Sequence, residues 1–224
     1  MGIVHSDSLV ATVDAVNEAF FEERRIPKAE AAEAAAWIVA RQGLRGAYRG
    51  MFAPTEADFK RGAVLFTGET IESRAGCAHV MGEEACRALL LLGGDKHVKD
   101  ALSRATSWMA PPTDHPLPMP GWYCCHTCSA AMWRHLAVSP APYAEMILAG
   151  GIRVVKSRRE RTGKWRGFPF YYTLLALTDI DLPGAREEMR YVAPVCERLL
   201  KRPARRDKVS RRRRAVMERA LGMA

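Results

Sequence analysis

Apolar residues recur along most of this chain at the three- and four-residue spacing of helices. The pattern predicts helices over 29–41, 82–92, 97–109, 124–138, 144–158, 170–179 and 185–201. Pro27 precedes the first of them, as is common at a helix start, and Gly93-Gly94 follows the second. The strand signal at Val64-Leu65-Phe66 is weak because it is so short. We therefore expect a mostly α fold.

The predicted helices alternate in type. Those at 29–41, 97–109, 144–158 and 185–201 carry a polar face, which is typical of helices on the outside of a domain. Those that begin near 77, 124 and 170 are nearly uncharged, and a helix that is apolar all round is normally buried. This inner type recurs roughly every 45 residues, a period typical of stacked helix pairs. The pattern predicts αα-hairpin repeats in a single domain over residues 1–200.

Two outer helices are followed by the same short pattern: a long polar residue, three further residues, glycine, one residue and an aromatic ring. It runs from Gln42 to Tyr48 and from Arg159 to Trp165. Glycine permits the turn after a helix, and the ring can cover the helix end. The long polar side chain can reach carbonyls that the helix leaves unpaired. We expect both segments to form compact turns of similar build.

This spacing resembles the Q-x3-G-x-W repeat of terpene cyclases and related α/α-toroid proteins, including protein prenyltransferases. The segment 165–177, WRGFPFYYTLLAL, also looks like a toroid turn that leads into an inner helix. Tyr48 stands where the repeat has Trp, and Arg159 where it has Gln. The acidic D-x-D-D and D-D-x-x-D motifs of cyclases are absent. The resemblance implies the architecture, a partial or small α/α toroid, and not cyclase activity.

The net charge of +9 on the 224 residues is concentrated at one end of the chain. Residues 198–224 hold eleven basic and two acidic residues, so residues 1–197 are neutral overall. We expect 201–224 to be a basic tail, helical or partly disordered. Arginine clusters bind phosphate well, which makes nucleic acid or another polyanion a candidate partner. The candidate phosphate-binding residues are Arg211, Arg212, Arg213 and Arg214. The alternative is a solvated helix that docks lightly.

Six cysteines without an export signal indicate a reducing cytoplasm, where clustered cysteines more often act as thiols or metal ligands than form disulfides. Cys124, Cys125 and Cys128 lie close together, and on a helix Cys128 shares a face with both. If the preceding inner helix lies beside them, Cys77 and His79 extend the set of sulfur and nitrogen ligands. Zinc is the default ion for such a set. Packed structural thiols and a redox or nucleophilic thiol remain alternatives.

Two other groups carry candidate chemistry. Glu83 and Glu84 lie in an otherwise apolar helix, where they could bind a cation or act as a general base. The alternative for this pair is a salt link from Glu84 to Arg87 on a solvated face. Aromatic rings near the starts of inner helices predict a ligand pocket, formed by Trp122, Tyr123, Trp165, Phe170 and Tyr172. A packed core without a cavity is the alternative there.

These observations favour a cytoplasmic α/α repeat protein that binds a small apolar ligand, a metal ion, or both. One alternative is a nucleic-acid-associated helical repeat protein that uses the basic tail. Another is a metal-dependent or isoprenoid-processing enzyme. No segment reaches the roughly 18 apolar residues that a membrane span needs. The exposed ends of a repeat array need capping, so we also consider a homodimer.

Overall fold

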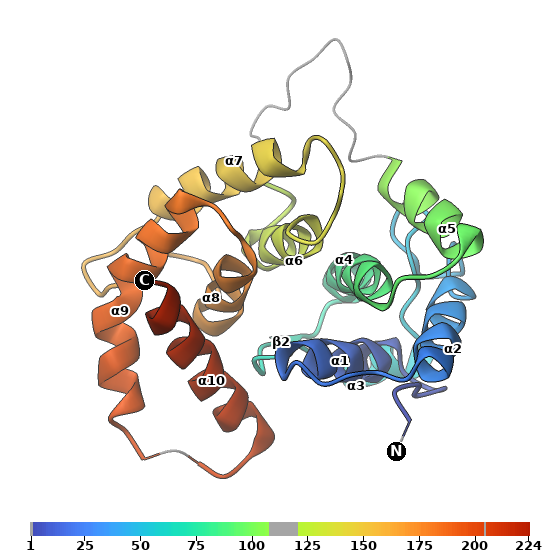
Figure 1. Ribbon diagram of the computed structural model, residues 1–224, viewed down its shortest axis with the longest axis horizontal. Helices are drawn as coiled ribbons and strands as arrows, with labels where there is room; N and C mark the ends of the chain where they lie inside the picture. The colour runs from blue at the N-terminus through green and yellow to red at the C-terminus, as the bar shows by residue number, and fades with distance from the viewer. Residues whose placement is uncertain (1, 108–120, 204) are drawn as a thin grey trace. The chain divides into compact units, whose positions relative to one another are not determined.

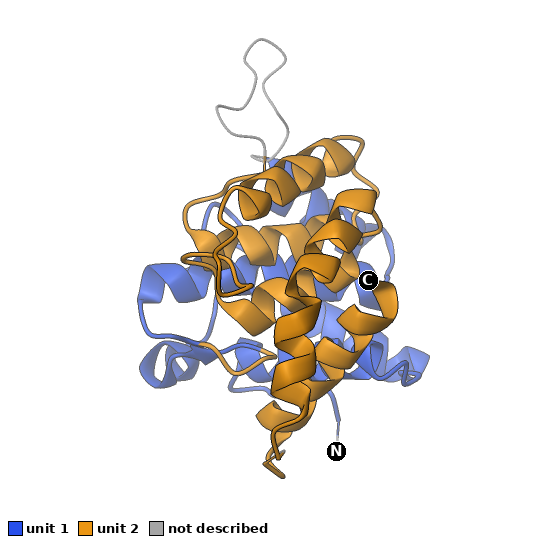
Figure 2. Cartoon of the chain, turned by 90° about the vertical axis from the view of Figure 1, so that its left-hand side faces the viewer, with its two compact units in different colours: residues 1–65, 70–116 blue, residues 66–69, 117–224 orange. Residues whose placement is uncertain are grey.

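The computed structural model describes residues 2–107, 121–203 and 205–224 (Figure 1). It is mostly helical, as the periodicity predicts, and its one small sheet joins two short strands. The chain divides into two compact units, where the sequence suggests one domain over 1–200 and a tail. Unit 1 comprises residues 1–65 and 70–116, and unit 2 comprises residues 66–69 and 117–224 (Figure 2). Residues 201–224 thus belong to unit 2.

Unit 1 is arranged around one long buried helix, α4 (Arg74–Leu92), which packs against three other helices of the unit. These are α1 (Leu9–Phe21), α2 (Lys28–Val39) and α5 (Lys96–Thr106). The unit also contains α3 (Glu56–Arg61) and an antiparallel pair of strands, β1 (Ala63–Val64) and β2 (Thr70–Ile71). The side chain of Ser73 caps the first turn of α4, and Gly93, with φ of 70°, follows its last residue.

Unit 2 is built on α8 (Phe170–Asp179), which contacts three helices. These are α6 (His126–Leu136), α9 (Pro183–Leu200) and α10 (Lys208–Met223). A further helix, α7 (Ala144–Lys156), packs on α6 and α9. Within this unit, α8 lies between α6 and α10 (Figure 1). The short segment 66–69 is held by α10, because Arg212 and Arg213 donate hydrogen bonds to the carbonyls of Phe66 and Thr67.

Burial within each unit follows the predicted alternation of helix types. Every residue from Tyr172 to Thr178 of α8 is buried, as are those from Cys128 to Leu136 of α6. In contrast, α5, α7 and α9 each keep an exposed polar face. The inner helices also bury charge, since Arg134 on α6 pairs with Asp179 at the end of α8. The toroid arrangement that the resemblance implies stays a prediction.

The two repeated segments after outer helices form turns of similar build. Gly46 and Gly163 adopt φ values of 94° and 74°, which favour glycine. Gln42 donates to the carbonyl of Ala101 in α5 at 2.7 Å. Arg159 donates to the carboxylate of Glu188 in α9 at 2.8 Å. In both turns the polar side chain therefore links the preceding helix to the next outer helix. Gln42 donates to a backbone carbonyl, as predicted, whereas Arg159 donates to a carboxylate.

The helix boundaries differ from the predicted ones in places. The first turn of α4 begins at Arg74, before the predicted start at residue 82, and α6 begins at His126 rather than at residue 124. The predicted helix over 97–109 is observed to Thr106, and residues 108 and 109 lie outside the described residues. Within the described part of the chain, none of the helices is both long enough and apolar enough to cross a membrane.

Candidate functional site

The candidate site lies at the first turn of α6, where a cysteine takes the place of the usual capping residue. Cys125 has extended backbone angles, φ −153° and ψ 175°, and its sulfur accepts the backbone N–H of Cys128 at 3.4 Å. Serine or aspartate oxygen normally fills this role at a helix start. The capping bond holds the sulfur of Cys125 over the exposed N–H groups of the first turn.

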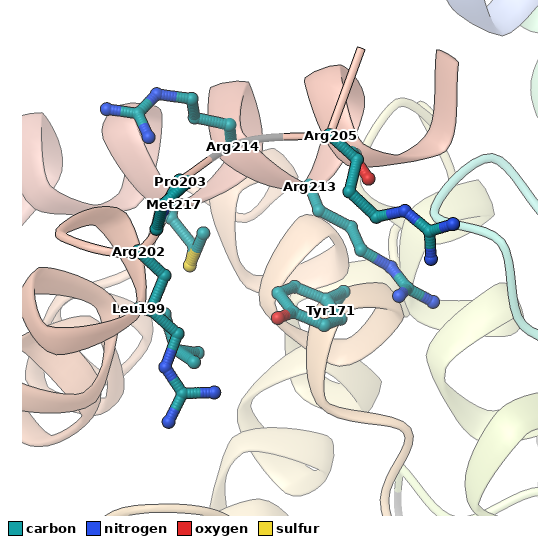
Figure 3. A pocket seen from close by; sticks show the side chains of 9 residues that line it. Tyr171, Leu199, Arg202, Pro203, Arg205, Arg213, Arg214 and Met217 are labelled. Atoms are coloured by element: carbon teal, nitrogen blue, oxygen red, sulfur yellow. The ribbon is translucent and has the colours of Figure 1, made fainter. Parts of the chain in front are cut away.

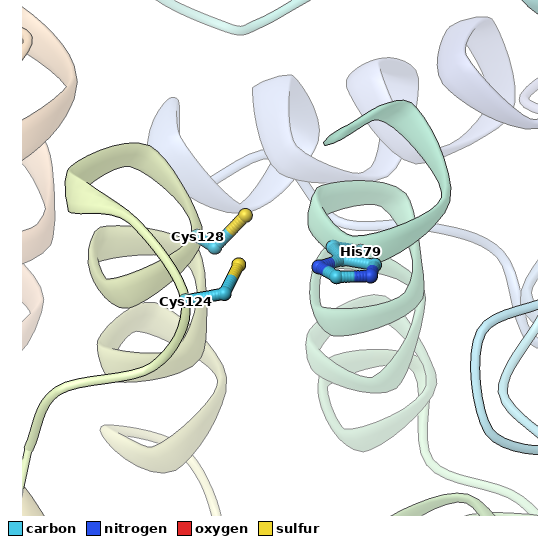
Figure 4. A group of neighbouring side chains, drawn as sticks. All are labelled: His79, Cys124 and Cys128. Carbon is cyan, nitrogen blue, oxygen red and sulfur yellow. The ribbon is translucent and has the colours of Figure 1, made fainter. Parts of the chain in front are cut away.

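Three thiols converge at this helix start. The sulfur atoms of Cys124 and Cys128 lie within 4.8 Å of each other and point the same way from α6 (Figure 4). Cys128 is buried, whereas Cys124 and Cys125 are exposed. The sequence interpretation placed all three on a helix. In the structure Cys124 and Cys125 precede the helix, and the capping geometry brings their side chains toward Cys128.

Side chains of α6 fasten the loop that carries the first two cysteines. The indole Nε1 of Trp133 donates to the carbonyl of Gly121 at 2.7 Å. Ser129 accepts the N–H of Tyr123 at 3.0 Å and donates to the carbonyl of Cys125 at 2.7 Å. Two side chains of α6 therefore hold the described part of this loop at Gly121, Tyr123 and Cys125.

The three thiols differ in acidity. The pKa of Cys125 is lowered to about 5, chiefly because the thiol of Cys128 donates a hydrogen bond to its sulfur. The backbone N–H groups of Cys128 and Thr127 and the side chain of Cys124 lower it further, whereas partial burial acts in the opposite direction. Burial raises the pKa of Cys124. The hydrogen bond to Cys125, burial and the neighbouring sulfurs raise the pKa of Cys128 well above the usual range. These shifts favour the thiolate of Cys125 over those of Cys124 and Cys128.

The other two predicted metal ligands, Cys77 and His79, lie on α4 in unit 1. Residues two positions apart on a helix point in different directions. Cys77 is buried, and burial together with the charge of Asp58 raises its pKa to about 12. His79 is half-buried, and its ring centroid lies 3.8 Å from that of Tyr48, the aromatic residue of the first repeated turn. Of these two residues, His79 is the one whose environment leaves it suited to bind a metal.

His126 follows the cysteine cap but belongs to an aromatic group. Its ring meets Trp122 edge-on at 5.0 Å and Phe168 at 4.6 Å between centroids. Its Nε2 is buried and has no hydrogen-bond partner among the described residues. Burial and the positive charge of Arg158 lower its pKa.

Two of the five aromatic residues predicted to line a ligand pocket, Trp165 and Tyr172, are buried. Trp165 donates from Nε1 to Glu188 at 2.9 Å and stacks on Phe170 at 5.9 Å between centroids. Tyr172 is fully buried, and Trp122 and Tyr123 lie in the loop before α6. One cavity of unit 2, of about 410 Å³, lies among Leu136, Pro140, Leu148 and Leu182 and has none of the five in its lining.

The predicted carboxylates of α4 are buried in unit 1. Glu83 and Glu84 have no more than 2% of their surface exposed, so they are not on a solvated face. Glu84 accepts a hydrogen bond from the side-chain amide of Asn17 on α1 at 2.8 Å. Arg87 donates to the oxygen of the same amide at 3.3 Å. The three side chains form a bridge between α1 and α4, a structural role that the sequence interpretation did not include.

The four consecutive arginines of the basic tail point in different directions around α10. Arg212 is buried and lies over the ring of Phe66, and Arg211 is exposed and donates to the carbonyl of Arg206. Arg213 and Arg214 face a second cavity of unit 2. The four arginines therefore differ in surroundings: Arg212 is buried, Arg211 is exposed, and Arg213 and Arg214 line a cavity.

Comparisons of the chain with protein-family models, with curated proteins and with solved structures give no match.

Proposed function

We propose that this protein is a metal-binding helical repeat protein, in which Cys124, Cys125 and Cys128 bind one zinc ion at the start of α6. The observation that supports this most is that the sulfurs of Cys124 and Cys128 lie within 4.8 Å of each other, next to the capping thiol of Cys125. Cysteine sulfur is the preferred ligand of structural zinc, at about 2.3 Å from the ion. In a tetrahedral site such sulfurs lie about 3.8 Å apart. The sulfur atoms of Cys124 and Cys128 lie at most 4.8 Å apart, so a small movement would bring them to the spacing of a zinc site.

The charge and the support of these thiols also fit a metal. A ligand thiol has to lose its proton, and the hydrogen bonds to Cys125 already favour its thiolate. The ion would replace the protons that Cys124 and Cys128 hold. The hydrogen bonds from Trp133 and Ser129 orient the loop, as outer-shell groups do around metal sites. A bound zinc ion would stabilise the loop and the first turn of α6.

For the fourth ligand we propose His79. Its imidazole is half-buried and packed by Tyr48, so its orientation is restricted. A water molecule in the fourth position is the other arrangement that three thiolates allow.

Elemental analysis of the full chain, purified without added metal, tests the proposal. We expect close to one equivalent of zinc per chain, and less than a tenth of that in the double variant Cys124→Ser/Cys128→Ala. Cys196→Ala is the matched control, because it removes a buried thiol of the same unit that lies on α9. The metal site would be refuted if the wild-type protein contained no metal as purified and still bound no zinc after incubation with it. It would also be refuted if the double variant contained as much metal as the wild type. If His79→Ala bound zinc as tightly as the wild type, His79 would not be the fourth ligand, and the proposal for the three cysteines would be unaffected.

The same geometry supports a second function, thiol–disulfide exchange. Cys125 is an exposed thiolate at a helix start, and Cys128 is a buried thiol three residues later. The thiolate of Cys125 would attack a disulfide of a partner protein, and the partner's first sulfur would leave as a thiolate. Cys128 would then lose its proton and attack Cys125. That step releases the partner's second sulfur and leaves a Cys125–Cys128 disulfide, with both electrons transferred to the partner.

Redox titration of metal-free protein in glutathione buffers distinguishes the two functions. A redox protein would form the Cys125–Cys128 disulfide reversibly, seen by mass spectrometry as the loss of both thiol hydrogens. A zinc protein would resist that oxidation until the ion is removed. Reversible oxidation with no zinc in the purified protein would favour the redox role over the metal site.

A further inference from the structure

A second cavity of unit 2, of about 220 Å³, lies where the end of α9 meets α10 (Figure 3). Four arginines surround it, and no acidic residue lines it. The lining consists of Tyr171, Leu199, Arg202, Pro203, Arg205, Ser210, Arg213, Arg214 and Met217. The arginines come from the connection before α10 and from its first two turns, so helix packing rather than sequence adjacency groups them.

The positive charge of this cavity is only partly compensated. Arg214 pairs with Glu218 at 3.1 Å, and Arg205 lies 4.0 Å from Asp207. Arg202 and Arg213 form no ion pair within the described residues. Like-charged guanidinium groups repel each other, so gathering four of them is unfavourable unless an anion balances the charge. The excess of two positive charges equals the charge of one phosphate dianion.

Two of the arginines are held in place, which suits a preformed site. Arg213 donates from Nε to the carbonyl of Thr67 at 2.7 Å and lies over the ring of Tyr171, 4.6 Å from its centroid. Arg214 donates to the carbonyl of Leu200 at 3.0 Å. Arg202 and Arg205 are exposed. Two fixed guanidinium groups and two free to close over a ligand form a clamp for an oxyanion.

The size of the cavity restricts the ligand. Pockets for drug-sized ligands run from about 300 to 1,000 Å³, and this one is smaller. It suits a phosphate group with a small attached moiety. An extended nucleic-acid strand is held instead by a groove that follows its backbone.

We propose that the cavity between α9 and α10 binds the phosphate group of a small phosphorylated molecule, with Arg202, Arg205 and Arg213 as its ligands. Arg214 contributes charge, and the hydroxyl of Ser210 can rotate from Asp207 to donate to the anion. This site is separate from the thiols of α6 and does not depend on a metal. In this proposal, arginines of the basic tail bind one phosphate group at a defined site and do not merely attract polyanions.

Isothermal titration calorimetry at constant ionic strength in chloride buffer tests this site. The probes are inorganic phosphate, AMP and a ten-nucleotide single strand of DNA. The variant Arg202→Gln/Arg205→Gln removes two exposed guanidinium groups that have no structural hydrogen bonds in the described chain. Arg206→Gln/Arg211→Gln is the control, because it removes the same charge from exposed positions outside the lining. Thermal unfolding without ligand confirms that both variants fold.

We expect phosphate or AMP to bind with one site per chain. The affinity should fall at least about tenfold in Arg202→Gln/Arg205→Gln, as for the loss of a charged hydrogen bond. It should change less than about twofold in the control variant, as expected of charges outside the site. Equal losses in both variants would show general electrostatic attraction and overturn the proposal. Binding of the DNA strand alone, or of none of the three probes, would also overturn it.

Discussion

Arg134 and Asp179 form a buried ion pair that joins α6 to α8, with Nε and Oδ2 3.0 Å apart and the side chains 3% and 6% exposed. Removing one partner of such a pair leaves a charge in a medium that cannot solvate it. We expect Asp179→Ala to lower the free energy of unfolding by about 3 kcal/mol or more. Urea unfolding followed by circular dichroism measures this change.

The surface pair of Arg186 and Asp181 is the control for that measurement. Their side chains are 49% and 89% exposed, although their atoms lie only 2.6 Å apart. Water and salt screen such a pair, so Asp181→Ala should change stability by less than about 1 kcal/mol. Equal effects of the two substitutions would show that burial does not decide the strength of the Arg134–Asp179 pair.

A second prediction concerns Gly151, where α7 approaches the indole of Trp133. A Cβ atom added at Gly151 would lie 2.5 Å from that ring. The ring cannot move freely, because its Nε1 is bonded to the carbonyl of Gly121. We expect Gly151→Ala to destabilise the protein by about 1–3 kcal/mol, the range for overpacked cores. The loss of the indole contact should also shift the tryptophan fluorescence.

Gly222 in α10 provides the matched substitution. It is also a helical glycine, but nothing lies within 4 Å of a Cβ placed there. Alanine is the better helix former by about 1 kcal/mol, so Gly222→Ala should leave stability unchanged or raise it. If Gly151→Ala were equally harmless, the close approach of α7 to Trp133 would not be present in solution.

The third prediction is the pH dependence of Cys125 in metal-free protein. Its pKa is lowered to about 5 chiefly by the hydrogen bond from the Cys128 thiol. Alkylation by iodoacetamide, followed at each cysteine by mass spectrometry, should therefore reach half its maximal rate near pH 5. Cys77, which is buried and has a pKa of about 12, should stay unmodified at neutral pH. Half-maximal alkylation of Cys125 above pH 8 would contradict the hydrogen bond from the Cys128 thiol.

The same pKa determines how Cys125 affects stability. Because the pKa is lower in the folded protein than in the unfolded chain, the thiolate stabilises the fold above the unfolded value, near 8.5. This contribution decreases as the pH falls toward 5 and is absent below it. Cys125→Ala, which has no thiolate, should therefore show a weaker dependence of unfolding free energy on pH between 5 and 8.5. Chemical denaturation at several pH values measures the difference.

The sequence predicts the helices well where apolar spacing and turn residues agree. The bounds of α8 match because Pro169 precedes it and its residues stay apolar to Asp179. The start of α6 was misplaced because cysteine is not among the residues usually expected to cap a helix. The first turns of α4 were missed because Gly76 interrupts the apolar pattern, although Ser73 caps them.

The candidate sites show a similar division. Spacing alone predicts that Cys124, Cys125 and Cys128 come together, because only a few residues separate them. Spacing cannot select the arginines of the cavity. Four consecutive residues spread around a helix, so Arg213 faces the cavity while Arg212 is buried against Phe66. Arg202 and Arg205 reach the same cavity only because α10 folds back on α9.

The last prediction separates the capping role of Cys125 from its proposed role as a metal ligand. Serine can accept the same N–H bond as the cysteine sulfur but is a poor zinc ligand. In metal-free protein, Cys125→Ser should therefore keep the stability of the wild type within about 0.5 kcal/mol, whereas Cys125→Ala should lose about 1 kcal/mol. In zinc-loaded protein, Cys125→Ser should unfold at a lower temperature than the wild type. A chelator should remove that difference, because only the wild type then loses a bound ion. Equal melting temperatures of zinc-loaded wild type and Cys125→Ser would restrict Cys125 to its capping role.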